Sequence, residues 1–329
     1  MYPKNRIRRL RISENMRNLV AESSIDIGHM VMPVFIDESL NEKKKIESMT
    51  GIYQHSLNSA EEYATMLKRI GVKWVLLFGI PKSKDAEATE AYNGNGIIQR
   101  AVPIFRGKGI GVITDLCMCE YTSHGHCGIL KGSYVDNDST INVYGKIAVS
   151  QAENGADIIA PSGMMDGEVG KIREYLDSSG FENIPIMAYS AKYSSSLYGP
   201  FRDAARSAPS FGDRKTYQMN PPNAREAMRE IELDIEEGAD IIMVKPASFY
   251  QDIIRMARDR FDLPIAAYSV SGEYQMIRNA IDRKFLSESA IEENTMGIFR
   301  AGADIVISYF TEQIASLKSV NDQVIKFKS

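Results

Sequence analysis

The chain has 329 residues, of which 44% are hydrophobic and 25% charged, a composition typical of a folded globular protein rather than a disordered or repetitive one. Its 39 Lys and Arg residues against 43 Asp and Glu residues leave a net charge of −4, so no overall positive field favours a nucleic-acid partner. No apolar run approaches the roughly 18 residues that a membrane-spanning helix needs, which also predicts no membrane partner.

The first segment, residues 1–29, is basic. It has no apolar core of the kind that a secretory signal requires, and its five arginines are Arg6, Arg8, Arg9, Arg11 and Arg17. Two interpretations remain open: an organelle transit peptide, or an N-terminal arm that packs on a partner subunit or lies in solvent. We expect the arm, followed by one catalytic domain over residues 30–329.

From residue 30 onward, short and nearly continuous apolar runs alternate with longer segments of helical spacing. Continuous apolarity is typical of a strand buried on both faces. The runs are Met30–Ile36, Lys73–Gly79, Gly109–Asp115, Ala156–Pro161, Ile184–Tyr189, Ala239–Lys245, Pro264–Ser271 and Ala303–Phe310. The helical segments include Ser59–Ile70, Ile141–Asn154, Asp166–Ser178, Asn223–Glu237 and Ser248–Arg260. For the first of these helices, Ser59 is the predicted N-cap.

Three junctions between a helix and a strand repeat the phrase Gly-Ala-Asp, at Gly155, Gly238 and Gly302. In each we expect the glycine to end the helix in a left-handed conformation. Eight strand–helix units in about 300 residues predict a (β/α)₈ TIM barrel, with a doubly wound sheet as the alternative.

The catalytic groups of such barrels lie at the C-terminal ends of the strands. Polar residues stand at these ends, where the preceding residues are apolar. They are Asp115, Ser162, Lys192, Lys245, Ser271 and Tyr309.

The three cysteines, Cys117, Cys119 and Cys127, fall within eleven residues directly after the third strand. Their odd number and the single residue between the first two argue against a disulfide framework and favour a reduced, cytoplasmic setting. Three thiolates suit Zn²⁺, and a missing fourth protein ligand predicts the open position of a catalytic site. A histidine, His124 or His126, remains an alternative fourth ligand. Three buried thiols without a metal are the other interpretation.

Lys192 and Lys245 end the fifth and sixth strands. A single lysine there is commonly a rim residue whose ammonium reaches water. Two on adjacent strands disfavour each other's charge, and burial does so too, so one amine is expected to be neutral near pH 7. A neutral amine attacks ketones to form a Schiff base. The pair therefore predicts a carbonyl substrate.

Residues 190–218 form a long segment rich in Gly, Pro and Ser, and its aromatic residues, including Tyr198, are typical of a lid that packs down. Its arginines, Arg202 and Arg214 among them, are candidates for clamping a carboxylate, although solvated surface charge is the alternative for any one of them.

Together these residues resemble the porphobilinogen synthase family, also called 5-aminolevulinate dehydratase. The resemblance covers nearly the whole chain. It is most specific at Asp115–Gly128, at Tyr189–Asp203 and at the Met-Val-Lys-Pro stretch that ends at Pro246. It implies the condensation of two 5-aminolevulinate molecules to porphobilinogen with loss of two waters, an early step of tetrapyrrole and heme biosynthesis.

The resemblance also implies roles for individual residues. Lys245 would be the Schiff-base lysine of the substrate that contributes the propionate side (the P side), and Lys192 would hold or activate the second, A-side molecule. The three cysteines would bind a catalytic zinc, since the zinc-dependent branch keeps all three. The substrate-binding residues would be Asp115, Ser162, Arg202, Arg214 and Gln218 on the A side, Ser271 and Tyr309 on the P side, and Tyr198 of the lid.

The resemblance has three further implications, which concern a second metal, the assembly of subunits and one position where this sequence differs from many members. Glu230 aligns with the glutamate that holds an activating Mg²⁺ in some bacterial members, a solvated helix residue being the alternative. The family forms homo-octamers whose N-terminal arms embrace neighbouring barrels. Gly163 stands where many members carry Asp or Ala.

Two other hypotheses compete with this one. A class I aldolase-like lyase on the same barrel would use one lysine and no thiolate metal site. A metal-binding or assembly protein would leave both lysines inert at the rim.

Overall fold

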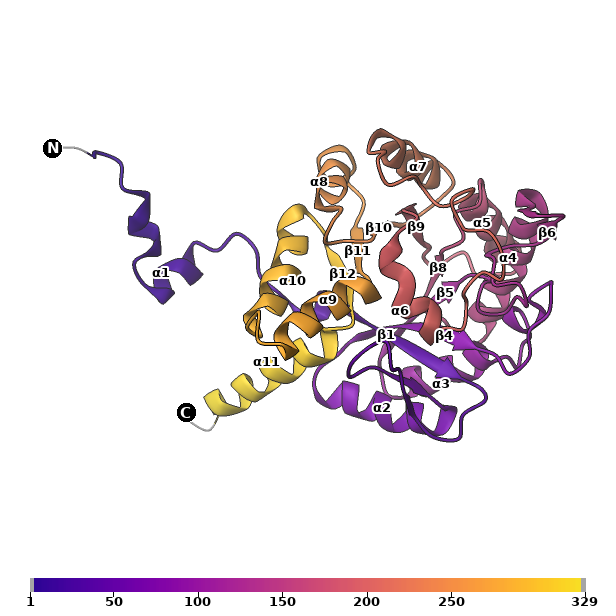
Figure 1. The fold of residues 1–329 in the computed structure, drawn as a ribbon, viewed down its shortest axis with the longest axis horizontal. Helices are drawn as coiled ribbons and strands as arrows, with labels where there is room; N and C mark the ends of the chain where they lie inside the picture. Colours follow the sequence, from indigo (N-terminus) through magenta and orange to yellow (C-terminus); the bar gives the residue numbers. More distant parts are fainter. Residues whose placement is uncertain (1–2, 327–329) are drawn as a thin grey trace.

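The computed structural model describes residues 3–326; residues 1–2 of the predicted arm and 327–329 of the predicted barrel domain lie outside it. Within that range eight parallel strands form a barrel surrounded by helices (Figure 1). The strands are β1 (Met30–Asp37), β4 (Trp74–Ile80), β5 (Gly111–Leu116), β8 (Ile158–Pro161), β9 (Met187–Lys192), β10 (Ile241–Lys245), β11 (Ile265–Ser269) and β12 (Ile305–Ser308).

The strand order confirms a barrel and excludes the doubly wound sheet. Neighbouring strands follow the order β8-β5-β4-β1-β12-β11-β10-β9, which runs through adjacent units of the chain without the reversal that a doubly wound sheet requires. A parallel bridge between Ile159 and Ile186 joins the two ends of this order. Each of the eight strands falls on one of the eight predicted apolar runs.

The helices outside the barrel cover the outward faces of the strands. They are α2 (Leu57–Arg69), α3 (Ile97–Gly107), α4 (Asn137–Glu153), α5 (Glu168–Ser178), α7 (Arg225–Glu236), α8 (Gln251–Arg260), α9 (Ser271–Asp282), α10 (Ser289–Ala301) and α11 (Thr311–Lys326). Two-sided coverage explains the apolar runs, because every residue of β1, β9 and β11 is buried. The predicted cap of α2 was wrong by three residues. Ser56 caps it and accepts the N–H of Ser59 at 3.1 Å.

The Gly-Ala-Asp junctions have two structural functions. Their glycines have φ angles of 93°, 104° and 125°, which confirms the predicted left-handed helix ends at Gly155, Gly238 and Gly302. The aspartates that follow tie neighbouring strands together at the N-terminal end of the barrel. Asp157, Asp240 and Asp304 each accept, at 2.8 Å, a backbone N–H from Val112, Ile186 and Ile265, respectively.

Short elements decorate this frame. Two hairpins pair β2 (Lys44–Lys45) with β3 (Tyr53–His55) and β6 (Leu130–Lys131) with β7 (Tyr134–Val135). Short 3₁₀ helices are η2 (Ile27–His29), η3 (Thr89–Ala91) and η4 (Ser196–Tyr198), and η4 leads into α6 (Gly199–Ala204), which lies across the mouth of the barrel (Figure 1).

The described residues before η2, from residue 3 onward, extend away from the barrel (Figure 1). It holds η1 (Ile7–Arg11) and α1 (Glu14–Leu19), neither of which has a buried residue. Apolar side chains are exposed on both, including Ile7 and Leu19. None of the helices within residues 3–326 combines the length and apolarity needed to cross a bilayer.

Candidate active site

The two lysines meet at the C-terminal end of the barrel. Lys192 is the last residue of β9 and Lys245 the last of β10, and the two are register partners. Each is only 5% exposed. Because the amines sit on neighbouring strands at the same edge, they face one cavity, together with Asp115 and Ser162 from the ends of β5 and β8.

Aromatic rings enclose the amine of Lys245. Its Nζ lies 4.2 Å from the ring centroid of Tyr268 and 5.0–5.3 Å from those of Tyr189, Tyr198 and Phe201. Burial, followed by the charge of Lys192, lowers the pKa of Lys245 to about 7. A substantial fraction of this amine is therefore neutral, and nucleophilic, at physiological pH.

Lys192 has the opposite surroundings. Its Nζ donates a hydrogen bond to the backbone carbonyl of Ser162. Burial alone would lower the pKa of Lys192, but the neighbouring Cys127 and Cys117 thiols and the Asp115 carboxyl outweigh burial, and the pKa is raised. The two amines of the pair thus differ in charge.

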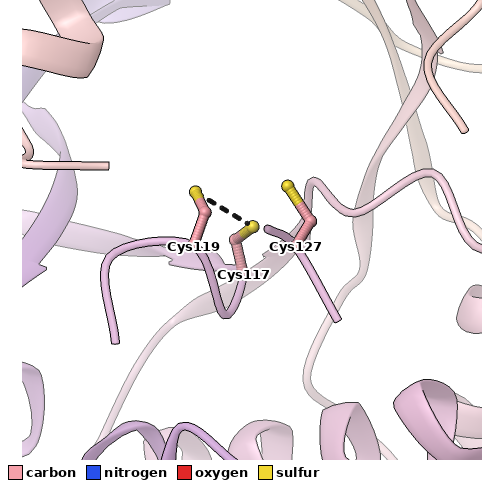
Figure 2. A group of neighbouring side chains, drawn as sticks. All are labelled: Cys117, Cys119 and Cys127. Carbon is pink, nitrogen blue, oxygen red and sulfur yellow. Dashed lines mark hydrogen bonds between the residues drawn. The ribbon is translucent and has the colours of Figure 1, made fainter. Parts of the chain in front are cut away.

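The three cysteines converge beside this pair. All are at most 3% exposed, and their sulfur atoms lie within 4.8 Å of one another. Figure 2 shows the three side chains pointing to the same side of their loop, with 3.4 Å between the sulfurs of Cys117 and Cys119. Sulfurs around one tetrahedral zinc are roughly 3.8 Å apart, so this cluster fits a metal ion.

The thiols differ in acidity. Hydrogen bonds from the other two cysteines lower the pKa of Cys127, whereas burial raises that of Cys117. In the absence of a metal the three sulfurs share protons through these hydrogen bonds. A metal ion that binds the sulfurs as thiolates takes the place of those protons.

Tyr144 supports the cysteine loop from behind, and the sequence did not single it out. Its hydroxyl donates to the backbone carbonyl of Cys127 at 2.5 Å. A side chain at Gly163 would collide with that hydroxyl, since an added Cβ would lie 2.0 Å from it. The glycine that departs from the family pattern therefore makes room for Tyr144.

Neither histidine of the loop joins the cysteines. The Nδ1 and Nε2 atoms of His126 lie 3.2 Å from the Tyr217 hydroxyl and 3.1 Å from the Phe211 carbonyl, respectively. His124 receives the backbone N–H of His126 on Nδ1 and contacts the Ala86 carbonyl through Nε2. Both nitrogens of each ring are engaged in these contacts, which disfavours a histidine as the fourth ligand.

Four polar side chains of the lid carry buried atoms without a hydrogen-bond partner, and the Oγ of Ser207 is one of these atoms. Both amide atoms of Gln218 are in this state, as are the Nε atoms of Arg202 and Arg214. Buried polar groups in folded proteins are nearly always paired, so such atoms mark a place for a ligand. Arg202 and Arg214 line the same cavity as the lysines.

The predicted P-side residues are brought near Lys245 in different ways. Tyr309 shares a 3.0 Å hydrogen bond with the hydroxyl of Tyr268, the ring closest to the Lys245 amine. The Ser271 hydroxyl instead contacts the lid, where it accepts the N–H of Phe201 at 3.0 Å. The Tyr198 hydroxyl donates to the carbonyl of Tyr193 at 2.6 Å, which leaves its ring facing Lys245.

Contacts from several strand-end loops hold the lid down. Arg206 forms a 2.9 Å ion pair with Asp37 at the end of β1, and its carbonyl accepts a hydrogen bond from Lys84. Arg214 donates to the carbonyl of Gly125 at 2.9 Å, and Gln54 donates to that of Ala204. The cavity under the closed lid measures only about 20 Å³, room for about one water. Substrate entry therefore requires the lid to move.

Glu120 is a second residue that sequence reasoning missed. It lines the cavity, and its carboxyl lies 3.2 Å from the Cys119 sulfur. Burial raises the pKa of Glu120 to about 8. Its position beside Cys119 in the cysteine loop was the available signal. Tyr189 and Tyr268 were also missed, and nothing in their spacing singles them out, whereas Phe201 is one of the aromatic residues of the predicted lid.

Glu230 lies elsewhere, on α7 outside the barrel. It lines a hollow of about 690 Å³ and another of about 460 Å³ that also contains Asp166. Burial, then the charges of Asp166 and Glu226, raises the pKa of Glu230. Neither of these two hollows is lined by Lys192 or Lys245.

Comparisons with known proteins agree on one family. Residues 4–317 match the family model described as delta-aminolevulinic acid dehydratase. Proteins of that name from Archaeoglobus fulgidus and Methanothermus sociabilis are 53% and 50% identical, each over 95% of this chain and 98% of the relative. A crystal structure of the enzyme from Toxoplasma gondii, in complex with the reaction product porphobilinogen, has a TM-score of 0.93 and 37% identity. It covers 95% of this chain and 91% of that one.

Proposed function

The chain belongs to the delta-aminolevulinic acid dehydratase family, and we propose that it condenses two 5-aminolevulinate molecules to porphobilinogen with loss of two waters. This activity is that of a lyase in tetrapyrrole biosynthesis. The lysine pair carries the proposal, because two amines at one strand edge with oppositely shifted pKa values suit two ketone substrates that are treated differently.

Lys245 is the nucleophile toward the first, P-side molecule. Its neutral amine attacks the ketone carbon, and loss of water gives a Schiff base. The amine is buried among aromatic rings, and this loss of water favours the neutral amine over the ammonium ion. Lys192 holds or activates the A-side molecule, with Asp115 and Ser162 beside it.

The carboxylates of the two substrates are bound by different groups. On the A side the unpartnered donors of Arg202, Arg214 and Gln218 supply charge and hydrogen bonds. On the P side Tyr309 and Ser271 offer hydroxyls. Ser271 becomes available when the lid releases its hydroxyl, and Tyr198 closes over the substrate with the lid.

Cys117, Cys119 and Cys127 hold a catalytic zinc. When bound, such an ion is a Lewis acid that polarises the carbonyl or hydroxyl of the A-side substrate. The soft, clustered sulfurs and the lack of a fourth ligand among the neighbouring histidines support this choice. Glu230 would hold an allosteric Mg²⁺, supported by the acidic charge of Asp166 and Glu226 around it.

The N-terminal arm, residues 1–29, contacts other copies of the chain in a homo-octamer. Its exposed apolar side chains, such as Ile7 and Leu19, support this role, since they gain from burial against a partner. Deletion of residues 1–20 should lower the particle mass in light scattering. An assembly of unchanged size would contradict the arm's role.

The reduced cysteines favour the cytoplasm as the location of the protein.

Borohydride trapping tests the proposed activity. The protein is incubated with 5-aminolevulinate and sodium borohydride, which reduces an imine to a stable amine, and the adduct is mapped by peptide mass spectrometry. We expect the adduct on Lys245. A protein that consumes no 5-aminolevulinate and forms no adduct would refute the function.

A further inference from the structure

A β-bulge in β9 turns one tyrosine toward the lysines. Along β10, Ile242 pairs with Ala188 and Val244 pairs with Ala191, so three steps of β9 oppose two steps of β10. The extra residue lets Ser190 and Ala191 both face outward. Ser190 contacts Asp234 of α7 there, and Ala191 packs in the outer core. Tyr189 and Lys192, which flank the bulge, therefore both face the barrel interior.

The ring of Tyr189 lies beside both amines. Its centroid is 5.0 Å from the Nζ of Lys245 and 5.5 Å from that of Lys192. Among the described aromatic rings it is the one in contact with both. Tyr189 thus stands at the boundary between the positions of the two substrates.

Its hydroxyl has no hydrogen-bond partner, although the side chain is only 1% exposed. Every other described tyrosine that is at most 4% exposed has one; these are Tyr144, Tyr193, Tyr198, Tyr268 and Tyr309. The carboxyl of Asp115 lies close enough to raise the pKa of Tyr189 through its charge and a hydrogen-bond-like contact, but the two side chains do not meet the geometry of a hydrogen bond, so a ligand atom can replace this loose contact. A buried hydroxyl left unpaired is unfavourable, and a hydrogen bond to a bound ligand atom removes that cost.

We propose that the Tyr189 hydroxyl donates a hydrogen bond to the ketone oxygen of the substrate that Lys245 attacks, and that Tyr189 is a catalytic residue. The inference rests on the proposed function. As the Lys245 nitrogen bonds to the ketone carbon, the carbon–oxygen π electrons move to the oxygen. A proton then passes from nitrogen to oxygen and completes the carbinolamine. A donor fixed at that oxygen stabilises the charge that develops on it.

The surroundings keep Tyr189 a donor. Burial first, and then the charge of Asp115, raises the pKa of Tyr189, so its hydroxyl remains protonated throughout the physiological range. Lys245 is the nearer of the two amines, which assigns the hydrogen bond to the ketone on that side.

The test compares Tyr189→Phe with Tyr193→Phe, a matched control. Tyr193 follows Lys192 on the outside of the barrel, and its hydroxyl donates to the Asn223 carbonyl at 2.8 Å. The probe is levulinic acid, a 4-oxo acid without the amino group, so that only the imine step is measured. The readouts are the rate of borohydride-trapped adduct on Lys245 and the melting temperature.

The two variants should behave in opposite ways. Tyr189→Phe should slow trapping by on the order of 100-fold, because one fixed donor is lost, without lowering the melting temperature, because the lost hydroxyl had no partner. Tyr193→Phe should lower the melting temperature and leave the trapping rate unchanged.

Three outcomes separate the claims. Trapping at an unchanged rate in Tyr189→Phe overturns the proposal, and so does a melting temperature that falls as it does in Tyr193→Phe, because that marks a structural hydrogen bond. Wild-type protein that forms no adduct refutes the proposed function instead. If Tyr189→Phe does not fold, difluorotyrosine at position 189 keeps the donor with a lower pKa. Deprotonation of the hydroxyl at high pH removes the donor, so trapping should fall there. With difluorotyrosine this fall should begin at lower pH than in the wild type, and an unchanged pH profile contradicts the proposal.

Discussion

The cavity has two walls that differ in the type of side chain that lines them. One, the metal-side wall, consists of the cysteine cluster with Asp115, Glu120 and the lid arginines. The other, the aromatic wall, consists of the rings around Lys245. Each wall contains one lysine, and the pKa of Lys192 is raised while that of Lys245 is lowered to about 7. The same side chain on adjacent strands thus carries a charge on one wall and a free electron pair on the other.

The comparison teaches that two equally buried amines can differ in charge because their charged neighbours differ. Both lysines are equally buried, at 5% exposure. Thiols and a carboxyl compensate the loss of water around Lys192. Around Lys245 the charge of Lys192 adds to the loss of water, and the charges of Asp115, Cys119 and Glu120 compensate this loss only in part.

Removing each amine should produce the largest effects. Lys245→Ala should abolish the trapped adduct and reduce turnover by on the order of 10⁵-fold, since the nucleophile is gone. Lys192→Ala should also impair turnover severely but still form the adduct on Lys245. Mass spectrometry and a 5-aminolevulinate consumption assay measure both. Equal adduct formation in the two variants, or intact turnover in Lys245→Ala, would remove the distinction between the lysines.

Dismantling the metal-side wall comes next. A triple Cys117→Ala, Cys119→Ala, Cys127→Ala variant should lose bound zinc, measured by elemental mass spectrometry, and lose turnover by about 10²- to 10³-fold, with chelation of the wild type giving the same loss. Adduct formation with levulinic acid should persist, because the aromatic wall is untouched. Full activity without bound metal would show that the sulfurs have another role.

A smaller effect is expected from the lid arginine. Arg214→Ala should raise KM by about 10- to 100-fold, because a charge-assisted hydrogen bond to the substrate carboxylate is lost. The increase should exceed that of any Lys245→Ala protein still active. Arg255→Ala, on the exposed face of α8 and paired with Asp259, is the control and should leave KM unchanged. An unchanged KM in Arg214→Ala takes this residue out of the carboxylate site.

The smallest change concerns pH. Below about pH 7 the amine of Lys245 becomes protonated, so the trapping rate should fall as pH falls. Phe201→Ala would admit water to the aromatic wall, weaken the desolvation that lowers this pKa and move that limb to higher pH by up to about one unit. Phe211→Ala, on the same lid but against His126, is the matched control. Identical pH profiles for the two variants would mean that the ring of Phe201 does not influence the amine.

Much of this arrangement could be predicted from the order of residues along the chain. A strand buried on both faces needs an unbroken apolar run, and the first polar residue after the run marks the strand end, so the sequence alone sufficed to locate Lys245. Local chemistry also sufficed for the left-handed glycines and for the cysteine cluster.

Other features of the site could not be predicted, because they depend on more than the alternation of inward and outward side chains along a regular strand. The bulge in β9 shifts the inward face by one residue, which concealed Tyr189. The contact of Ser271 with Phe201 joins residues 70 positions apart. The enclosure of Lys245 by rings from two strands and the lid is likewise a product of the closed barrel, not of any local pattern.

The closed lid has a consequence for affinity. The substrate can bind only those protein molecules whose lid is open. Its apparent dissociation constant is therefore the intrinsic dissociation constant of the open form divided by the fraction of protein molecules in that form. The ion pair between Asp37 and Arg206 and the hydrogen bond from Gln54 to Ala204 stabilise the closed form. Residues that never touch 5-aminolevulinate therefore set part of the concentration at which the enzyme works. Selection on the residues of these contacts can tune that concentration while the chemistry beneath the lid stays the same.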